Sequence, residues 1–367
     1  MQALILAGGE GTRLRPLTST VPKPVVPLVD RPFIAFMLDW LRGHGVDDVV
    51  MSCGHMADGV RRVLGDGEAV GVRLRYLEEP RPLGTGGALK YAEDLMDDRF
   101  LMLNGDVLTD IDVSAQLAQH ERTGARATLA LYPVEDPSAY GLVRLSGDGA
   151  VTEFVEKPAP DQIDTNNISA GVYVLERSVF SLLSKGAPAS IERDVFPRLV
   201  GNGLYGHVSH GYWKDIGTPE RYLEATFDIL EGTVQTEVAA RMGPSYVCVE
   251  DGVASSGRII PSALVEGDCV IGEGARIGGR AVLEYGVTVG EGTTIESAVV
   301  MRGAEIGAHC TLRGCIVAAG AKIGEHCVID GMSVIGEGVV LGADNVVSNG
   351  ARLFPGVTLP DGALRFL

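Results

Sequence analysis

A six-residue repeat of aliphatic side chains runs through the last third of the chain. Aliphatic residues stand six apart without a break from Val247 to Met301, and after two one-residue slips the spacing resumes at Ile306 and Ile323. Neither the 3.6-residue period of an α-helix nor the two-residue alternation of a half-buried strand produces this spacing. A parallel β-helix does, because each of its short strands turns one aliphatic side chain inward. We therefore predict a β-helix over residues 247–367.

Glycine is concentrated in the same region, where 22 of the 49 glycines fall within the last 121 residues. Many of them directly follow a repeated aliphatic residue, as in Ile271-Gly272 and Ile306-Gly307, where we expect the backbone to turn a tight corner. Aromatic residues are scarce here. The pattern resembles the hexapeptide repeats of left-handed parallel β-helices.

The two slips in the repeat lead to further expectations. They should bend or notch the stack of coils and leave aliphatic side chains such as Val299 and Val300 exposed. A second copy of the chain would cover these side chains, because most soluble oligomers are closed homo-oligomers. We therefore expect the β-helix to make a homodimer or a higher even-numbered oligomer.

The first half of the chain follows a different pattern, in which short apolar segments alternate with amphipathic ones. Strands are predicted at residues 3–6, 49–52, 72–77 and 100–103, and helices at residues 33–43, 56–64 and 86–96. This alternation indicates an α/β, Rossmann-like domain with a mostly parallel mixed sheet, in which ligands bind beyond the carboxyl ends of the strands. We predict a catalytic domain over residues 1–230 and a linker over residues 231–246, followed by the β-helix.

The overall composition excludes several classes of protein. Hydrophobic residues make up 46% and charged residues 22% of the chain, as in globular proteins. A formal net charge of −17 argues against a nucleic-acid partner or a basic membrane-binding surface. We see neither an apolar run of membrane-spanning length nor a signal peptide, and the six cysteines contain no Cys-x-x-Cys pair. We therefore expect a cytoplasmic protein with no membrane partner.

A glycine-rich loop follows the first predicted strand. Its backbone amides could cradle phosphate oxygens, and Arg13 would add charge-assisted hydrogen bonds. The loop lacks the third glycine of a dinucleotide-binding fingerprint, because Leu14 stands there, and it lacks the Gly-Lys-Ser/Thr of a P-loop. A glycine loop alone can be no more than a tight turn, so the residues around it must decide its role.

Those residues resemble the sugar-1-phosphate nucleotidyltransferases, also called sugar nucleotide pyrophosphorylases. The run G-G-x-G-T-R-L-x-P-L-T from Gly8 to Thr18 is followed by Pro-Lys-Pro around Lys23. Further motifs follow in the order typical of the family: Leu83-Gly84-Thr85, Asn104-Gly105-Asp106, Phe154-Val155-Glu156-Lys157-Pro158, Ser169-Ala170-Gly171-Val172-Tyr173 and Trp213-Lys214-Asp215-Ile216-Gly217-Thr218-Pro219. The stretch from Ser190-Ile191-Glu192 to Phe196-Pro197 is similar to that of mannose-1-phosphate guanylyltransferases.

The resemblance implies a reaction between a nucleoside triphosphate and a sugar 1-phosphate. A phosphate oxygen of the sugar attacks the α-phosphorus, and pyrophosphate leaves. Because two polyanions must meet, positioning and charge neutralisation carry the catalysis. The family's pattern assigns the metal, Mg²⁺, to Asp106 and Asp215, and the triphosphate to Arg13 and Lys23.

The remaining site residues are also implied by the resemblance. Lys157 matches a catalytic position that holds the sugar phosphate, and Glu156 one that faces sugar hydroxyls. Further sugar-phosphate positions are Gly141, Asn166 and Gly171. The nucleotide-binding positions, besides Arg13 and Lys23, are Leu6, Ala7, Gly8, Gly9, Gly11, Thr12, Glu79, Pro82, Gly84, Thr85, Asn104, Gly105 and Asp106.

Glu79 bears on the choice of base. Thymidylyl and uridylyl enzymes of this family usually carry glutamine here, which offers one donor and one acceptor to a pyrimidine. An ionised glutamate only accepts, and guanine presents N1–H and N2–H₂ as adjacent donors. Glu79 therefore favours GTP and, with the family likeness, mannose 1-phosphate. A glucose-1-phosphate thymidylyltransferase or uridylyltransferase is the alternative, and a surface role for this carboxylate is another.

Two alternatives belong to other functional classes. Hexapeptide β-helices often carry acyltransferase sites, for which His309 or His326 would supply the catalytic histidine. A non-catalytic regulatory paralogue that binds a sugar nucleotide is the other alternative, but Arg13, Lys23 and Asp106 are all retained. His309-Cys310 and His326-Cys327 also resemble a metal pair, although filling of stacked coils explains them better than zinc.

Overall fold

The computed structural model divides the chain into two compact units. The first, here the sheet unit, comprises Met1–Glu10 and Ile34–Trp213. The second, here the β-helix unit, comprises Gly11–Phe33 and Lys214–Leu367. The structure describes residues 1–54 and 56–365. The domain limits predicted from the sequence stay a prediction. In the structure, residues 11–33 group with the β-helix.

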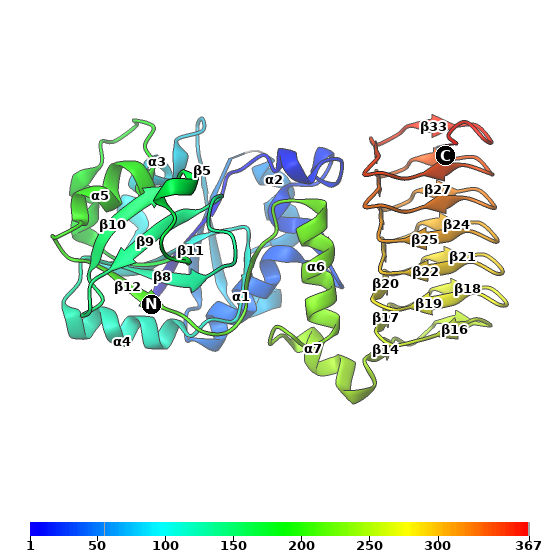
Figure 1. Ribbon diagram of the computed structural model, residues 1–367, viewed down its shortest axis with the longest axis horizontal. Coiled ribbons are helices and arrows are strands. Elements are labelled where there is room, and N and C mark those ends of the chain that lie inside the picture. The colour runs from blue at the N-terminus through cyan, green and yellow to red at the C-terminus, as the bar shows by residue number, and fades with distance from the viewer. Residues whose placement is uncertain (55, 366–367) are drawn as a thin grey trace. The chain divides into compact units, whose positions relative to one another are not determined.

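A nine-stranded mixed sheet forms the centre of the sheet unit (Figure 1). Its main path runs β10-β9-β11-β6-β1-β4-β5, and β8 joins β11 to β12. Strands β6, β1, β4 and β5 are parallel, whereas β11 runs antiparallel to both β6 and β8. The strands of this unit are β1 (Gln2–Ala7), β4 (Asp48–Cys53), β5 (Arg73–Glu78), β6 (Arg99–Asn104), β7 (Val107–Thr109), β8 (Ala127–Pro133), β9 (Gly141–Leu145), β10 (Val151–Glu156), β11 (Asn167–Glu176) and β12 (Leu204–Val208).

The central strands are apolar on both faces, as a sheet covered by helices requires. Leu4 and Ile5 of β1 point to opposite faces and are both fully buried. The helices are α1 (Phe33–Gly43), α2 (Ala57–Leu64), α3 (Gly84–Tyr91), α4 (Val113–Thr123) and α5 (Phe196–Leu199). The predicted alternation of strands and helices is therefore confirmed. Helix α3 is shorter than predicted, because it ends at Tyr91 and a separate 3₁₀ turn follows at Glu93–Leu95.

The part of the β-helix unit that precedes the coils is not a simple linker. It contains β2 (Pro27–Leu28), β3 (Arg31–Pro32), the end of β13 (Trp213–Asp215), α6 (Pro219–Leu230) and α7 (Glu237–Met242). The predicted linker over residues 231–246 thus includes a helix. Thr236 begins α7 by accepting a hydrogen bond from the amide of Ala239 at 3.0 Å, which satisfies a free N–H of the first turn.

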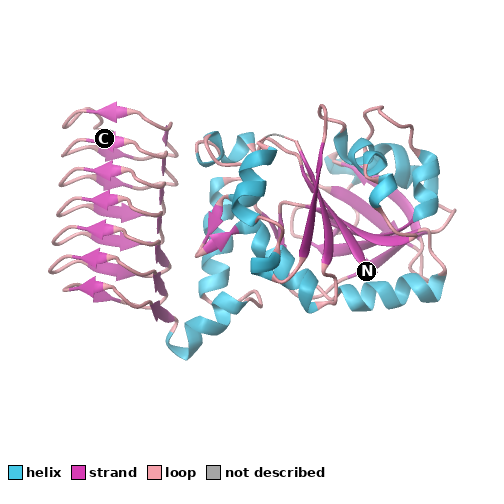
Figure 2. Cartoon of the chain, turned by 180° about the vertical axis from the view of Figure 1, so that it is seen from behind, coloured by secondary structure: helices cyan, strands magenta, loops and turns pink. Residues whose placement is uncertain are grey.

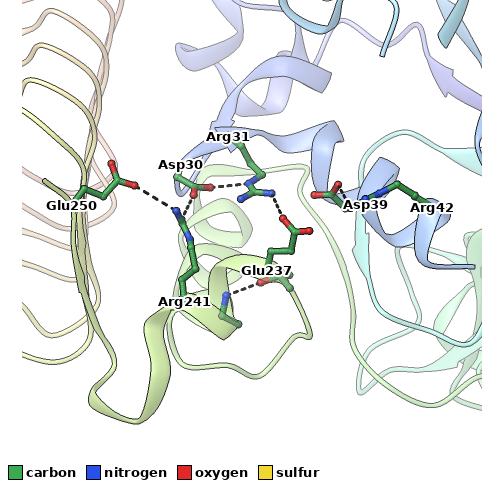
Figure 3. A network of polar contacts seen from close by, with 9 residues as sticks. Asp30, Arg31, Asp39, Arg42, Glu237, Arg241 and Glu250 are labelled. Carbon is green, nitrogen blue, oxygen red and sulfur yellow. Dashed lines mark hydrogen bonds and ion pairs between the residues drawn. The ribbon is translucent and has the colours of Figure 1, made fainter. Parts of the chain in front are cut away.

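A network of ion pairs fixes this region to the first coil (Figure 3). Asp30 pairs with Arg241 of α7 and with Arg31, whose Nε lies 3.0 Å away. Arg31 also reaches Glu237, and Arg241 reaches Glu250 just after β14, each at 3.4 Å. The side chain of Asp30 is only 8% exposed, so this carboxylate is better shielded from water than an ordinary surface partner.

Seven coils of a parallel β-helix follow, stacked in chain order (Figures 1 and 2). The first sheet contains β14 (Val247–Val249), β17 (Ala263–Val265), β20 (Ala281–Leu283), β23 (Val299–Val300), β26 (Ile316–Val317), β29 (Val334–Ile335) and β32 (Arg352–Leu353). The second contains β15 (Ala254–Ser255), β18 (Val270–Ile271), β21 (Thr288–Val289), β24 (Glu305–Ile306), β27 (Lys322–Ile323), β30 (Val340–Leu341) and β33 (Thr358–Leu359). The third contains β16 (Arg258–Ile259), β19 (Arg276–Gly278), β22 (Thr294–Glu296), β25 (Thr311–Arg313), β28 (Val328–Ile329) and β31 (Val346–Val347).

The repeated aliphatic residues fill the interior of the coils, as the six-residue spacing predicts. Ile271, Ile277, Leu283 and Val289 are all buried in one continuous core. Cys310 and Cys327 lie in the same core, and the rings of His309 and His326 stack with centroids 5.3 Å apart. These pairs therefore serve the stacking of coils, which confirms the structural interpretation of the two His-Cys sequences.

The slips in the repeat are absorbed by shorter coils. Val265 pairs with Leu283, 18 residues on, whereas Leu283 pairs with Val300, only 17 residues on. Val300 and Val317 face the core, so the placement of Met301 in the inward series is wrong by one residue. All three sheets stay paired through both slips, and the slips do not interrupt the stack.

The expected exposure of two valines is also wrong. Val299 and Val300 are both fully buried within the single chain. Val300 faces the core of the coils, and Val299, the next residue along the strand, points to the other face of the sheet. Because these side chains are already covered, they give no support to assembly with a second copy, which stays a prediction.

The glycines after the repeated aliphatics directly precede turns, as expected, and they also have a second role. Gly290 and Gly307 do not adopt a left-handed backbone conformation. A Cβ atom on Gly290 would lie 2.5 Å from the amide nitrogen of Ala308, and one on Gly307 would lie 2.7 Å from that of Glu325. Glycine is therefore required because the backbones of successive coils nearly touch.

Replacing such a glycine should destabilise the coil stack. We expect Gly307→Ala to lower the free energy of unfolding by about 1–3 kcal/mol, the usual cost of overpacking. Gly303→Asn is the matched control, since Gly303 has open space around its Cα and a left-handed φ of 65° that asparagine tolerates. Urea unfolding followed by circular dichroism measures both, and equal losses would contradict the close-approach explanation.

Candidate active site

The loops after strands β1, β4 and β6 meet through their backbones. The amide of Gly105 donates to the carbonyl of Leu6 at 2.9 Å, and a Cβ on Gly105 would lie 2.7 Å from that oxygen. A Cβ on Gly54 would lie 2.9 Å from the carbonyl oxygen of Gly8. Three predicted nucleotide-binding residues, Leu6, Gly8 and Gly105, are thus brought together at the carboxyl ends of parallel strands, where such sheets bind ligands.

Glu79 lies against the same loops. Its Oε1 accepts a hydrogen bond from the Ser52 hydroxyl at 2.9 Å, and its Oε2 accepts one from the Leu83 amide at 3.2 Å. A Cβ on Gly8 would lie 3.1 Å from Glu79 Oε1, so the glycine loop passes directly beside the carboxylate. The two hydrogen bonds fix the orientation of the carboxylate and leave each oxygen able to accept another.

Asn104 connects this group to a predicted sugar-binding residue. Asn104 ends β6, and a Cβ on Gly171 would lie 2.9 Å from its Nδ2. Gly171 has a φ of 73°, so a side chain there would be disfavoured both by the backbone conformation and by Asn104. The structure therefore brings together Asn104 and Gly171. The family resemblance assigned Asn104 to the nucleotide and Gly171 to the sugar phosphate.

Gly84 and Thr85 pack against residues 189–192. A Cβ on Gly84 would lie 2.6 Å from the carbonyl oxygen of Ala189. The Thr85 hydroxyl donates to Glu192 Oε2 at 2.7 Å and accepts from the Ile191 amide at 2.9 Å. The contacts observed for these two predicted nucleotide-binding residues thus join two loops of the protein itself.

Glu156 and Glu192 form a pair of neighbouring carboxyl groups. Burial raises the pKa of Glu156, the Glu192 carboxylate raises it further, and Lys157 and Arg193 act in the opposite direction. A Cβ on Gly141 would lie 2.5 Å from Phe154 Cζ, which leaves no room for a larger residue, and 3.2 Å from Glu156 Oε2. Lys157 has a left-handed φ of 52°, and its amide donates to the carbonyl of Tyr140 at 3.0 Å. Acidic and basic groups thus meet at the end of β10.

The other predicted site residues belong to the β-helix unit. The carbonyl of Gly11 accepts a hydrogen bond from the Thr18 hydroxyl at 2.8 Å, and a Cβ on Gly11 would lie 3.1 Å from the Cβ of Lys23. Gly11 has a φ of 62°, a conformation that glycine adopts readily. This turn sets the aliphatic stem of Lys23 beside the start of the segment that carries Thr12 and Arg13.

Asp215 lies between two guanidinium groups. Arg221 Nη1 is 2.6 Å from Oδ1 and 2.5 Å from Oδ2 of Asp215. A Cβ on Gly217 would lie 2.8 Å from Arg13 Nη2 and 2.9 Å from Asp215 Oδ1, so a side chain there would displace at least one of these two groups. Lys214 instead bonds Asp228 at 2.7 Å and Glu224 at 3.1 Å on α6.

Some predicted site residues have a less informative place in the structure. Pro82 and Asn166 are exposed, and the Asn166 carbonyl accepts a hydrogen bond from the Val134 amide at 3.0 Å. Gly9 is exposed and has open space around its Cα. Ala7 ends β1, and Asp106 lies directly before β7. The roles assigned to all these residues stay predictions.

Comparison with known proteins decides the family. Residues 2–232 match the family model described as nucleotidyl transferase. The chain belongs to the nucleotidyl transferase family. Residues 259–361 of this nucleotidyl transferase match a second model, described as the GMPPB C-terminal domain.

Curated relatives span nearly the whole length of the nucleotidyl transferase. A mannose-1-phosphate guanylyltransferase of Mycobacterium tuberculosis is 40% identical over 371 residues, covering 100% of this chain and 98% of the relative. A probable mannose-1-phosphate guanylyltransferase 1 of Oryza sativa subsp. japonica is 33% identical, covering 97% and 96%. The crystal structure of HddC from Yersinia pseudotuberculosis complexed with GMP-PN is 28% identical with a TM-score of 0.53, covering 61% of this chain and 97% of that one.

Two polar groups of the nucleotidyl transferase escaped the sequence analysis as site residues. Glu192 was noted only as part of a shared stretch, yet it bonds Thr85, and its charge raises the pKa of Glu156. Arg221 lies six residues after Asp215, and its link to the carboxylate needs the turn into α6 at Thr218. A spacing that spans a turn gives no periodic signal, so sequence alone could not have found this pair.

The predicted metal ligands fit a hard cation in their chemistry. Enzymes of this family typically use a divalent metal ion. Magnesium takes one or two carboxylates and completes its shell with phosphate oxygens and water. Asp215 offers carboxylate oxygens at a position only 8% exposed, and the described residues contain no gathered set of three or more His, Cys, Asp or Glu side chains. Each of the two carboxylates, Asp106 and Asp215, is thus of the chemical type that magnesium takes. Among the described residues, no helix is long and apolar enough to cross a membrane.

Proposed function

We propose that the protein is a mannose-1-phosphate guanylyltransferase that makes GDP-mannose from GTP and mannose 1-phosphate. A phosphate oxygen of the sugar attacks the α-phosphorus of GTP, the bond from that phosphorus to the bridging oxygen breaks, and pyrophosphate leaves. The relatives from Mycobacterium tuberculosis and Oryza sativa carry this name and match nearly the whole chain. Membership of the nucleotidyl transferase family favours this function over an acyltransferase. The retained Arg13, Lys23 and Asp106 favour it over a regulatory paralogue.

Glu79 is the residue that we propose selects the base. The Ser52 hydroxyl and the Leu83 amide hold its two oxygens in a fixed plane beside the glycine loop. A carboxylate held in this way accepts the adjacent N1–H and N2–H₂ donors of guanine. A pyrimidine presents a single N3–H beside a carbonyl oxygen, which the second carboxylate oxygen would repel. The fixed orientation of the Glu79 carboxylate is the single observation on which the proposal of GTP rests.

Charge neutralisation at the phosphates is assigned to the basic residues and a metal ion. We assign the triphosphate to Arg13 and Lys23, which share one turn of chain with Gly11. Asp106 and Asp215 are the proposed ligands of Mg²⁺. The bound ion would neutralise charge on the triphosphate. Arg221 holds both oxygens of Asp215, and we propose that this ion pair sets the orientation of the carboxylate.

The sugar 1-phosphate is assigned to the end of β10. Lys157 would meet the phosphate, and Glu156 would accept hydrogen bonds from sugar hydroxyls. Burial and the Glu192 carboxylate raise the pKa of Glu156, and the neighbouring Lys157 acts in the opposite direction. Gly141, Asn166 and Gly171 complete the proposed sugar site.

The substrates and the free cysteines suit a reducing cytoplasm, where we propose that the protein works.

Removing either proposed metal ligand should abolish turnover without unfolding the protein. We expect Asp106→Asn and Asp215→Asn each to lower kcat by at least ~100-fold, the effect of losing one key electrostatic group. Asp94→Asn is the control, because Asp94 forms only an exposed ion pair with Lys185 at 3.6 Å. Pyrophosphate release measures activity, and circular dichroism checks the fold. Near wild-type activity in a folded variant would remove that residue from the metal site.

Changing the charge at Glu79 should change the preferred nucleotide. We expect Glu79→Gln to lower kcat/KM for GTP by about 10- to 100-fold, because guanine then faces an N–H donor, and to raise the relative use of dTTP or UTP. Glu78→Gln, at the exposed neighbouring residue, is the control. Equal efficiencies with GTP and dTTP in the wild type, unchanged by the substitution, would refute the assignment.

We also propose that the β-helix makes a homodimer or a higher even-numbered oligomer. Val249, Val270 and Val340 are exposed apolar residues on its coils, and a second copy could cover them. Light scattering at micromolar concentration should give at least twice the mass of one chain. A single-chain mass would refute the assembly.

A further inference from the structure

Helices α6 and α7 run along the stack of coils in the β-helix unit. At the start of α6, Glu220 forms an ion pair with Arg352 of the last coil, at 3.2 Å. Further along α6, the ring of Phe227 lies under the guanidinium of Arg280 at the start of the third coil, 4.9 Å from the ring centroid. Helix α7 reaches the first coil through Arg241. The start of α6 is therefore held by the last coil, at the opposite end of the stack from α7.

The first turn of α6 also carries Arg221, which holds both oxygens of Asp215. The Thr218 hydroxyl caps this turn by accepting a hydrogen bond from the Arg221 amide at 3.4 Å. Because Glu220 and Arg221 are adjacent in one turn, the contact of Glu220 with Arg352 restrains the backbone from which Arg221 reaches Asp215. The last coil thus restrains the helix turn next to the proposed metal ligand.

The segment that carries Lys23 lies against the same coils. Residues 16–27 line one side of a small pocket, and Met301 and residues of the following coils line the other side. The Thr20 hydroxyl donates a hydrogen bond to Glu337, which lies between β29 and β30. The β-helix therefore contacts both of the segments that carry proposed phosphate and metal residues of this unit.

Tyr222 joins these two segments directly. Its phenol hydroxyl donates a hydrogen bond to the carbonyl of Pro27 at 2.7 Å, across 195 positions of sequence. Pro27 follows the turn of Lys23 at once, because the amide of Val26 donates to the Lys23 carbonyl at 3.2 Å. Tyr222 is only 1% exposed, so water does not compete for the phenol. One buried hydrogen bond thus connects the turn of Lys23 to the helix that holds Asp215.

We propose that Tyr222 is a positioning residue of nucleotidyl transfer, which sets Asp215 and Lys23 at a fixed separation. Through Arg352 and Glu337, the coils hold the two segments that Tyr222 joins. The metal ion and the lysine must neutralise charge on one triphosphate, so a displacement between the two segments would weaken both effects. This inference rests on the roles proposed for Asp215 and Lys23, but not on which base or sugar the enzyme uses.

Tyr222→Phe tests the proposal, because it removes the hydroxyl and keeps the ring. We expect it to raise the Kd for GTP, measured by calorimetry with Mg²⁺ and without sugar, and the KM for GTP by at least ~5-fold. The KM for mannose 1-phosphate should change less than about twofold, since Glu156 and Lys157 lie in the sheet unit. A smaller amount of folded enzyme would lower kcat and leave both KM values unchanged, so this split separates positioning from loss of stability.

Thr226→Val is the matched control. Thr226 is fully buried on the same helix, and its hydroxyl donates to the carbonyl of Tyr222 at 2.9 Å. The substitution therefore removes a buried hydrogen bond within α6 and leaves the connection to Pro27 in place. The Kd and KM for GTP should stay at their wild-type values. Unchanged values in folded Tyr222→Phe, or an equal rise in Thr226→Val, would overturn the proposal.

A double variant tests the contribution of the coils. Glu337→Ala combined with Arg352→Ala removes two exposed contacts, and it should raise the KM for GTP by about 2- to 10-fold. Glu305→Ala combined with Lys322→Ala removes an exposed ion pair of 2.8 Å between two other coils and should leave this KM unchanged. Equal KM values in the two double variants would show that the coils do not hold the segments. If Tyr222→Phe does not fold, that result alone would overturn the proposal.

Failure of the proposed function gives a different result. A wild type that used another nucleotide would contradict the choice of GTP, and the same comparison of Kd and KM would then be made with that nucleotide. Full activity in Asp215→Asn would instead remove the metal ligand that Tyr222 is proposed to position, and the positioning role with it.

Discussion

Close approach between backbones at glycine is the constraint on which both units depend. In the sheet unit, Gly54 and Gly105 let the loops after β4 and β6 touch the loop after β1. In the β-helix, Gly290 and Gly307 let successive coils stack. The same absence of a side chain thus lets loops meet at one edge of the sheet in one unit and lets the coils form a continuous core in the other. A Cβ at any of these positions would come within 3 Å of neighbouring backbone atoms, which natural contacts essentially never show.

Polar residues of the proposed site are held in place by hydrogen bonds from neighbouring groups. Glu79 is held by Ser52 and Leu83, Asp215 by Arg221, and Thr85 by Glu192 and Ile191. These hydrogen bonds fix the orientation of each side chain, and a carboxylate oxygen that takes part in one can still accept a hydrogen bond from a further donor. Pre-orientation of this kind suits a reaction between two anions, because little reorganisation of the protein is left for the moment of transfer.

Much of the architecture could be predicted from sequence because it follows from periodicity. The limits of α1 agree to the residue, and the six-residue spacing predicts the β-helix. The position of the slip could not be predicted, because Val300 and Met301 are both apolar and only packing shows which one faces inward. Family motifs indicated Glu79, Asn104 and Gly171, but no motif indicates that Asn104 and Gly171 touch, or that Arg221 holds Asp215.

The division of the chain between Glu10 and Gly11 has a consequence for recombination between relatives. The glycine-rich motif is continuous in sequence, yet its first part belongs to the sheet unit and its second part to the β-helix unit. A chimera joined near residue 230 would take Thr20 and its partner Glu337 from two different parents. Exchange of whole β-helices among such enzymes is therefore constrained by residues 11–33, a segment that lies far from the coils in the sequence.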